Sequence, residues 1–226
     1  MRKRATEIWN SIKNLFHYQQ IEDTMKKELP YSNLQLALVV AGVSVLVSSL
    51  VYIVMMVETL HMVNYLSDLA AQEIVNSPPV LTMENITSFA LFQLFFNAPL
   101  FLAVFLIFEA LAFGAFKISG GKGTFEQQIY LSSLVLFAMN ISTVLGLALP
   151  LPCLNLLSVP ALLILTLYFI LFVNVKAYGL VHDVSFLHGL TVLILLGIPR
   201  LWVLVVVPEM AAGLFGLPNG IDFGGV

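Results

Sequence analysis

The fold is decided by residues 89–116, FALFQLFFNAPLFLAVFLIFEALAFGAF, in which Glu109 is the single charged residue. About 20 consecutive apolar residues are enough for a helix to cross the hydrocarbon core of a bilayer, and this stretch is longer. We therefore predict a transmembrane helix that is tilted or kinked. Pro99 lies inside it and lacks a backbone N–H, which gives a physical reason for a kink.

The composition of the whole chain agrees with a lipid environment. Of its 226 residues, 59% are hydrophobic and 10% are charged, and the mean hydropathy is +0.96. A soluble domain has about 25% charged residues, because its surface must face water. The net charge of -3 and the lack of a basic stripe predict no nucleic-acid partner. The single cysteine, Cys153, excludes an intramolecular disulfide.

Four other apolar segments resemble the first. We predict an all-α fold, a polytopic transmembrane helical bundle of five spans that occupies residues 32–207. The spans cover about 36–57, 89–116, 129–149, 158–175 and 190–207. Residues 208–226 are rich in Gly and Pro and are predicted to form a poorly ordered tail outside the cytoplasm.

The first span carries two further signals. Ser32 and Gln35 have the spacing of a capping box, which would begin the helix after Pro30. Four small residues on one face would let another helix approach closely: Ala37, Ala41, Ser44 and Ser48. The helical pattern continues past the membrane toward Ser77-Pro78-Pro79.

Residues 1–31 form a separate, more polar segment that we predict to be helical from Ala5 to Leu29. Its apolar residues recur at three- and four-residue spacing and so share one stripe: Ile8, Trp9, Ile12, Leu15 and Phe16. With its basic residues, this pattern is typical of an amphipathic helix that lies in the cytoplasmic membrane interface. A cytosolic helix that packs on the protein's own loops is an equal alternative.

The distribution of basic residues predicts the orientation, because short cytoplasmic loops hold an excess of Lys and Arg. With the N-terminus in the cytoplasm, nine of the ten basic residues fall on the inner side: Arg2, Lys3, Arg4, Lys13, Lys26, Lys27, Lys117, Lys122 and Lys176. The outer segments, about 58–88, 150–157 and 208–226, hold none. We therefore predict a multi-pass cell-membrane protein with a cytoplasmic N-terminus and an extracytoplasmic C-terminus.

Two ionisable residues fall inside spans, Glu109 in the second and Arg200 in the fifth. An intramembrane charge costs about 2.5–3.5 kcal/mol on insertion scales, so a buried pair is a simple way to offset it. At 1.5 Å per residue they lie about 12 and 18 Å from the cytoplasmic ends, which a long Arg side chain can bridge. The alternatives are that Glu109 is protonated or reaches Lys117, while Arg200 binds carbonyls freed by Pro199.

Asn140 in the third span and Asn174 at the end of the fourth are candidate interhelical hydrogen-bonding residues. His182, Asp183 and His188 share a cytoplasmic loop, but they form an incomplete set of metal ligands, and a polar loop is the simpler interpretation. We find no metalloprotease motif and no serine–histidine pair at one depth, and we predict no enzymatic activity and no cofactor.

A glycine-rich turn, Gly120-Gly121-Lys122-Gly123-Thr124, joins the second and third spans. It lacks the Ser or Thr that directly follows the lysine in a phosphate-binding loop, so we interpret it as a tight cytoplasmic turn. Thr124 and Gln127 have capping-box spacing and would begin the third span.

The stretch from Phe113 to Phe125, which contains Gly120, Gly121, Lys122 and Gly123, resembles the Yip-domain family of Ypt/Rab-interacting membrane proteins, in which a similar turn joins the second and third of five spans. Residues 176–185, KAYGLVHDVS, resemble the family's short connector after the fourth span. The third span lacks the family's proline, and the short N-terminal segment lacks its acidic region. The resemblance implies a prokaryotic, non-catalytic member and leaves a small GTPase partner unsupported.

Three functions follow from these patterns. The first is a non-enzymatic protein that resembles Yip-domain proteins and acts through contacts with the lipid bilayer, with other membrane proteins or with its own copies. The second is a small transporter or channel subunit whose polar path is lined by Glu109, Asn140, Asn174 and Arg200. The third is an accessory subunit of a larger complex that docks through the small-residue face of the first span or through the outer helix.

Overall fold

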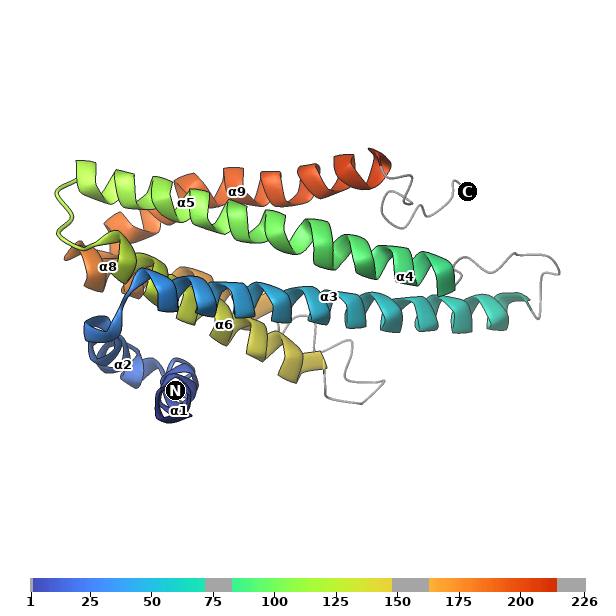
Figure 1. The fold of residues 1–226 in the computed structure, drawn as a ribbon, viewed down its shortest axis with the longest axis horizontal. Helices are drawn as coiled ribbons and strands as arrows, with labels where there is room; N and C mark the ends of the chain where they lie inside the picture. The colour runs from blue at the N-terminus through green and yellow to red at the C-terminus, as the bar shows by residue number, and fades with distance from the viewer. Residues whose placement is uncertain (1, 72–82, 148–162, 215–226) are drawn as a thin grey trace.

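The structure is a computed structural model that describes residues 2–71, 83–147 and 163–214. Within these ranges every regular element is helical. In chain order the labelled elements are α1 (Arg2–Asn14), η1 (Tyr18–Gln20), α2 (Ile21–Glu28), η2 (Leu29–Tyr31), α3 (Leu34–Ala71), α4 (Met83–Phe92), η3 (Gln93–Asn97), α5 (Ala98–Ile118), α6 (Phe125–Leu147), η4 (Phe169–Asn174), α8 (Val175–His182) and α9 (Phe186–Leu214) (Figure 1). The all-helical prediction is therefore confirmed for the described residues.

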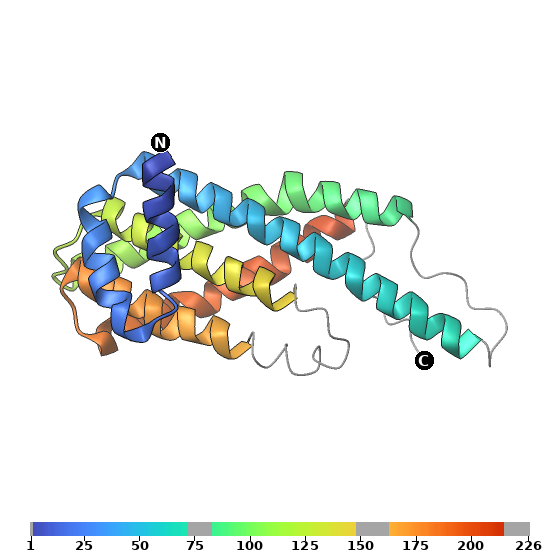
Figure 2. The ribbon, with the colours of Figure 1, turned by 90° about the horizontal axis from the view of Figure 1, so that it is seen from below.

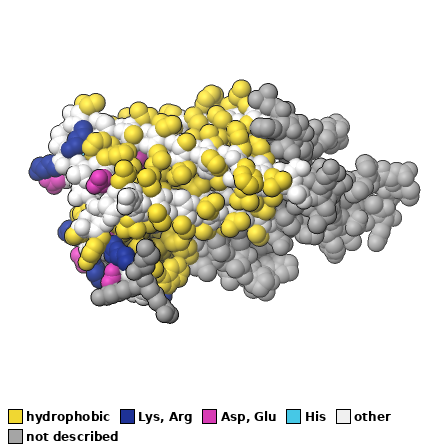
Figure 3. All heavy atoms as spheres, in the orientation of Figure 1, with side chains coloured by type: hydrophobic (Ala, Val, Ile, Leu, Met, Phe, Trp, Pro, Cys, Tyr) yellow, Lys and Arg dark blue, Asp and Glu magenta, His cyan; other side chains and the backbone are white. Residues whose placement is uncertain are grey.

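Four helices are long and apolar enough to cross a membrane: Leu34–Val51, Ala90–Ile118, Leu163–His182 and Phe186–Pro208. They match four of the five predicted spans and support a membrane-embedded bundle. In Figure 3, hydrophobic side chains cover the length of the visible face, and charged side chains gather at one end. This distribution is the one that lipid requires, since lipid-facing helices must expose apolar side chains.

Helix α6, which covers the third predicted span, is not among these four, and five spans are not confirmed. It lies inside the bundle, between α3 and the segment that leads into α8 (Figure 2). Residues 128–136 of this helix are all buried. Polar side chains on a helix that faces protein on all sides need protein partners rather than lipid.

The small-residue face of α3 is covered by α6. Ala37, Ala41 and Ser44 are all fully buried in the core that the two helices share. Small side chains let the two backbones approach, and this contact leaves that face unavailable to another protein. Docking of an accessory subunit through Ala37, Ala41 and Ser44 is therefore not supported, and docking through the outer helix stays a prediction. The cap of α3 also differs from the prediction. The backbone N–H of Leu36, in the first turn, donates to the side chain of Asn33 at 2.7 Å, so Asn33 rather than Ser32 caps the helix.

The N-terminal segment forms two helices, α1 and α2, rather than the single predicted helix. Its apolar stripe packs on the bundle: Ile12, Leu15, Ile21 and Met25 are at most 2% exposed and belong to the main core. The sequence left open whether this stripe meets the membrane interface or the protein, and in the structure it packs on the protein. Both helices lie across one end of the bundle (Figure 2).

A buried carboxylate fixes this N-terminal pair to α6. Glu28 accepts hydrogen bonds from Arg4 at 2.6 Å, from Ser11 at 2.6 Å and from the Tyr130 hydroxyl at 2.7 Å. Arg4 also packs its guanidinium over the ring of Tyr31 at 4.1 Å. Because Tyr130 belongs to α6, these contacts join residues 2–31 to the centre of the bundle.

The kink near Pro99 and the ends of two predicted spans differ in detail from the prediction. The kink near Pro99 takes the form of a π-helical turn, η3, in the residues directly before it, where the proline ring would otherwise meet the carbonyl four residues earlier. The fourth span stays helical to His182, so the connector to α9 is only 183–185. Helix α9 continues to Leu214, so it includes the first seven residues of the predicted tail from 208 to 226. The predicted outer segment at 150–157, the Ser77-Pro78-Pro79 stop and residues 215–226 lie outside the described residues.

Candidate functional site

Glu109 on α5 is the centre of a buried polar cluster. It is 1% exposed, and its carboxylate accepts hydrogen bonds from three side chains on two other helices. One oxygen accepts from Gln128 Nε2 at 2.8 Å and from Ser132 Oγ at 3.1 Å, and the other accepts from the Tyr178 hydroxyl at 3.0 Å. A carboxyl group so far from water needs such donors, because an unpaired one would carry the full cost of desolvation.

Gln128 connects this carboxylate to His182. Its amide nitrogen donates to both the side chain and the backbone carbonyl of Glu109, and its amide oxygen lies 2.8 Å from His182 Nε2. An amide oxygen only accepts, so in this arrangement Nε2 is the protonated nitrogen of the imidazole. The other nitrogen, Nδ1, is buried without a hydrogen-bond partner among the described residues. The His182 ring stacks on Phe116 with centroids 4.6 Å apart.

The two stretches that carry the family resemblance meet at this point. The backbone N–H of Lys122 donates to the carbonyl of His182 at 3.1 Å. A Cβ on Gly121 would lie 2.9 Å from His182 Nδ1, and a Cβ on Gly123 would overlap the carbonyl of Val181. Gly120 has φ +89°, a conformation that favours glycine. The glycines are therefore required by close packing of the turn on the end of α8, and Phe125 beside them begins α6.

The end of this turn is capped as predicted. Thr124 and Gln127 exchange reciprocal hydrogen bonds between side chain and backbone N–H, at 3.1 and 3.3 Å, and the predicted capping box is confirmed. On the exposed side of the turn, Lys122 Nζ lies 2.7 Å from a carboxylate oxygen of Asp183. The hydrogen bond and charge of each partner lower the pKa of Asp183 and raise the pKa of Lys122.

A cavity of about 340 Å³ adjoins the cluster. Its walls come from α5, α6, residues 166–178 and α9, and most of them are aromatic or aliphatic. Its polar groups are few: Ser132, Thr166, Asn174, Tyr178 and Arg200. Ligand sites in proteins have this character, with apolar walls and a small number of polar groups, and volumes from about 300 Å³ upward.

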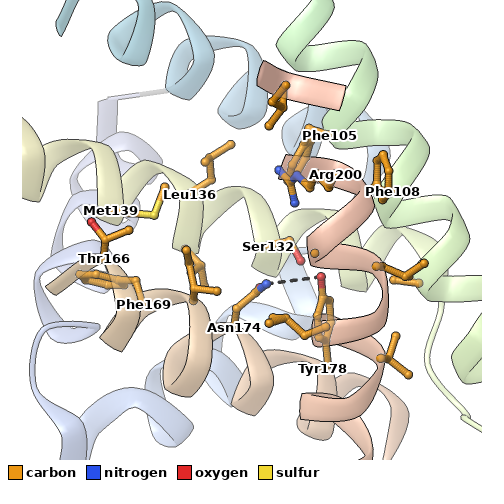
Figure 4. Close-up of a pocket in the computed structure, with 18 of the residues that line it drawn as sticks. Phe105, Phe108, Ser132, Leu136, Met139, Thr166, Phe169, Asn174, Tyr178 and Arg200 are labelled. Atoms are coloured by element: carbon orange, nitrogen blue, oxygen red, sulfur yellow. Dashed lines mark hydrogen bonds between the residues drawn. The ribbon is translucent and has the colours of Figure 1, made fainter. Parts of the chain in front are cut away.

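Arg200 projects from α9 toward the wall of this cavity near Phe105 and Phe108 (Figure 4). Its guanidinium carbon lies 5.3 Å from the Phe105 ring centroid, a cation–π distance. The expected ion pair with Glu109 is not formed, because no Arg200 nitrogen is within 4.0 Å of that carboxylate. The reason is that Gln128, Ser132 and Tyr178 already occupy the Glu109 oxygens. Arg200 acts on Glu109 only through longer-range electrostatic attraction.

The two candidate asparagines lie apart. Asn140 donates from α6 to the backbone and the hydroxyl oxygens of Ser44 on α3, at 2.9 and 2.8 Å, on the side away from the cavity. Asn174 lines the cavity and donates to Tyr178 one turn along its own chain, at 3.4 Å (Figure 4). The described residues therefore do not form a single polar path that is lined by Glu109, Asn140, Asn174 and Arg200.

The candidate metal ligands also point in different directions. His182 is buried against Gln128, whereas Asp183 is exposed beside Lys122, and His188 contacts the ring of Phe116 at 5.8 Å. In the described part of the chain no group of three His, Cys, Asp or Glu side chains is placed to hold a metal ion.

Sequence reasoning missed Gln128, Ser132 and Tyr178, the three donors to Glu109. Gln128 and Ser132 are four residues apart, so they share one face of α6, and this polar face within an apolar helix was a readable signal. Tyr178 carried no signal, because it stood in a segment interpreted as a loop. Only the continuation of the helix to His182 turns it toward the cluster.

Comparisons of the chain with models of known families, with curated proteins and with solved structures give no match. The function is therefore inferred from the cluster and the cavity themselves.

Proposed function

We propose that the chain is a non-enzymatic membrane protein that crosses the cell membrane five times and binds a lipid-like molecule inside its helix bundle. Its N-terminus would lie in the cytoplasm and its C-terminus outside. Helix α6 has 23 residues, about 35 Å at 1.5 Å per residue, which exceeds the hydrocarbon core of about 30 Å. The side chains of Gln128, Ser132, Ser133, Asn140 and Ser142 are buried in protein, which removes the usual objection to placing them in a bilayer.

The observation that carries the lipid-binding proposal is the apolar cavity between α5, α6, α8 and α9. Its aromatic and aliphatic walls match an acyl chain, and Ser132, Asn174, Tyr178 and Arg200 are among its few polar lining groups. Binding in a preformed cavity also fits the absence of a catalytic set in the cluster, since every Glu109 oxygen is already held by protein donors.

Kinship with Yip-domain proteins is part of this proposal. It is supported by the contact between the turn at residues 120–124 and the end of α8, because the two stretches that resemble the family depend on each other through the glycines. A shared architecture would explain why both stretches occur in one chain.

Photolabelling tests the binding site. The full chain is reconstituted in phosphatidylcholine nanodiscs with an uncharged, long-chain alcohol that carries a diazirine in its tail. We expect labelled peptides from α5, α6 and α9 at residues that line the cavity. Labelling only on the outer surface of the helices would overturn the proposal.

A matched pair of glycine variants sharpens this test. A Cβ on Gly197 meets nothing within 4 Å, and Gly197 lines the cavity, so Gly197→Leu fills the space without displacing protein. Gly114 is equally open but lies off the cavity, so Gly114→Leu is the control. We expect Gly197→Leu to abolish labelling inside the cavity and Gly114→Leu to leave it unchanged. Equal labelling of both variants would count against the site.

A further inference from the structure

Arg200 is a cation without a hydrogen-bonding partner. Among the described residues its guanidinium forms no hydrogen bond and no ion pair, and its defined contact is the face of Phe105. A guanidinium has five N–H donors and stays charged at all ordinary pH values. The wall of the cavity therefore presents several unused donors and a full positive charge to whatever occupies it.

The depth of Arg200 limits the ligands that can reach it. Residue 197 is the middle of the span Phe186–Pro208. Arg200 therefore lies three residues from the middle of the span, about 4.5 Å along the helix axis. The head groups of bilayer phospholipids remain about 15 Å from the midplane, outside the hydrocarbon core. A phospholipid that stays in the bilayer would therefore bring its tails, but not its phosphate, to this depth, and a ligand whose head meets Arg200 must lie inside the bundle.

The cavity is also narrow for a two-chain lipid. Its volume of about 340 Å³ is near the lower limit for sites that hold drug-sized molecules. Along α9 it extends from Val192 to Leu204, about 18 Å at 1.5 Å per residue. This long, thin and mostly apolar shape matches one acyl chain.

We propose that the cavity binds a single-chain amphiphile with a carboxylate head, a long-chain fatty acid, whose carboxylate pairs with Arg200. This inference rests on the proposed lipid-binding function and names the ligand class for the same cavity. A planar guanidinium can hold a carboxylate through two parallel hydrogen bonds. The hydroxyl of Tyr178 and the amide of Asn174, which line the same cavity, are neighbouring polar groups for the head.

The test compares three probes on the full chain in phosphatidylcholine nanodiscs: oleic acid, oleyl alcohol and oleoyl lysophosphatidylcholine. Binding is measured by displacement of radiolabelled oleate. We expect oleate to bind about ten to a hundred times more tightly than the alcohol, the range for a hydrogen-bonded charge. Arg200→Gln should remove that preference, and Arg200→Lys should restore part of it, because lysine keeps the charge without the planar fork. Lys176→Gln, a basic residue off this cavity, should change nothing.

The outcomes separate the two proposals. Equal binding of oleate and oleyl alcohol that is blocked by Gly197→Leu would overturn the carboxylate assignment and leave lipid binding intact. Tighter binding of the lysophospholipid than of oleate would overturn it as well. If no probe binds in a manner sensitive to Gly197→Leu, both proposals fail. Should Arg200→Gln not fold, the comparison of oleate with oleyl alcohol on the wild-type chain still decides the question.

Discussion

Replacement of Glu109 should distinguish a hydrogen-bonding role from a role of its charge. In Glu109→Gln the amide oxygen can take the position that accepts from Gln128 and Ser132, and the amide NH2 then faces the Tyr178 hydroxyl. A hydroxyl both donates and accepts, so Tyr178 can turn and accept from the new NH2. We expect a loss of unfolding free energy of about 1 kcal/mol, because each partner keeps a hydrogen bond to residue 109 and only the Tyr178 O–H loses its acceptor.

Glu109→Ala should be much more damaging. Three side-chain hydrogen bonds disappear, and interhelical bonds in membranes average about 0.6 kcal/mol, which sums to roughly 2 kcal/mol. Two hydroxyls also lose their acceptor in a buried site, each at a cost of about 1–3 kcal/mol when they find no other. We therefore expect a total loss of about 2 kcal/mol if both hydroxyls find another acceptor, and of up to about 8 kcal/mol if neither does.

The assay for both variants is equilibrium unfolding in mixed micelles of a mild detergent and SDS, followed by the change in helix signal. We predict that Glu109→Gln unfolds at nearly the same SDS fraction as the wild-type chain, and that Glu109→Ala unfolds at a clearly lower SDS fraction. If the two variants lost the same stability, the charge rather than the hydrogen bonds would be what the cluster requires. If Glu109→Ala matched wild type, the cluster would contribute nothing to stability.

Three other regions give direct predictions. Gly123→Ala should lower thermal stability in detergent, because its Cβ overlaps a backbone carbonyl at the end of α8, whereas Gly114→Ala, in open space, should be neutral or slightly stabilising. The Lys122–Asp183 contact should weaken only at extremes of pH. Because the pKa of Asp183 is lowered, its contribution to folding stability is present above about pH 3.9 and is lost below that value. Because the pKa of Lys122 is raised, its contribution to folding stability is lost only above about pH 10.4. An NMR titration of the Asp183 carboxyl should give a midpoint that Lys122→Gln moves upward. Glu28→Ala should release α1 and α2 at a cost of about 2 kcal/mol, seen as faster hydrogen exchange in residues 2–31 with the spans unchanged.

The sequence was sufficient to predict most of the helices, but it was not sufficient to predict which side chains contact one another between helices. Hydrophobic runs and the Thr124–Gln127 cap depend on local chemistry, so they could be read directly. The stripe with Ile12 and Leu15 was correctly seen as apolar, but periodicity does not say whether an apolar face meets lipid or protein.

The ion pair between Glu109 and Arg200 was the natural expectation from two lone charges, and the structure replaces it with neutral donors from α6 and α8. Such donors look unremarkable in sequence, because a Gln, a Ser or a Tyr in a helix carries no charge to be balanced. Which face each helix turns toward α5 is a tertiary property, and only the packed bundle fixes it.

The single cysteine offers the most direct test of the five-span topology. If α6 crosses the membrane, Cys153, which follows it in the chain, lies on the side opposite the turn that contains Lys122. In sealed right-side-out vesicles, an impermeant maleimide should label Cys153 before lysis. A cysteine at position 122, in a Cys153→Ser background, should be labelled only after lysis. Labelling of both positions only after lysis would contradict the account, since α6 would then not cross the bilayer.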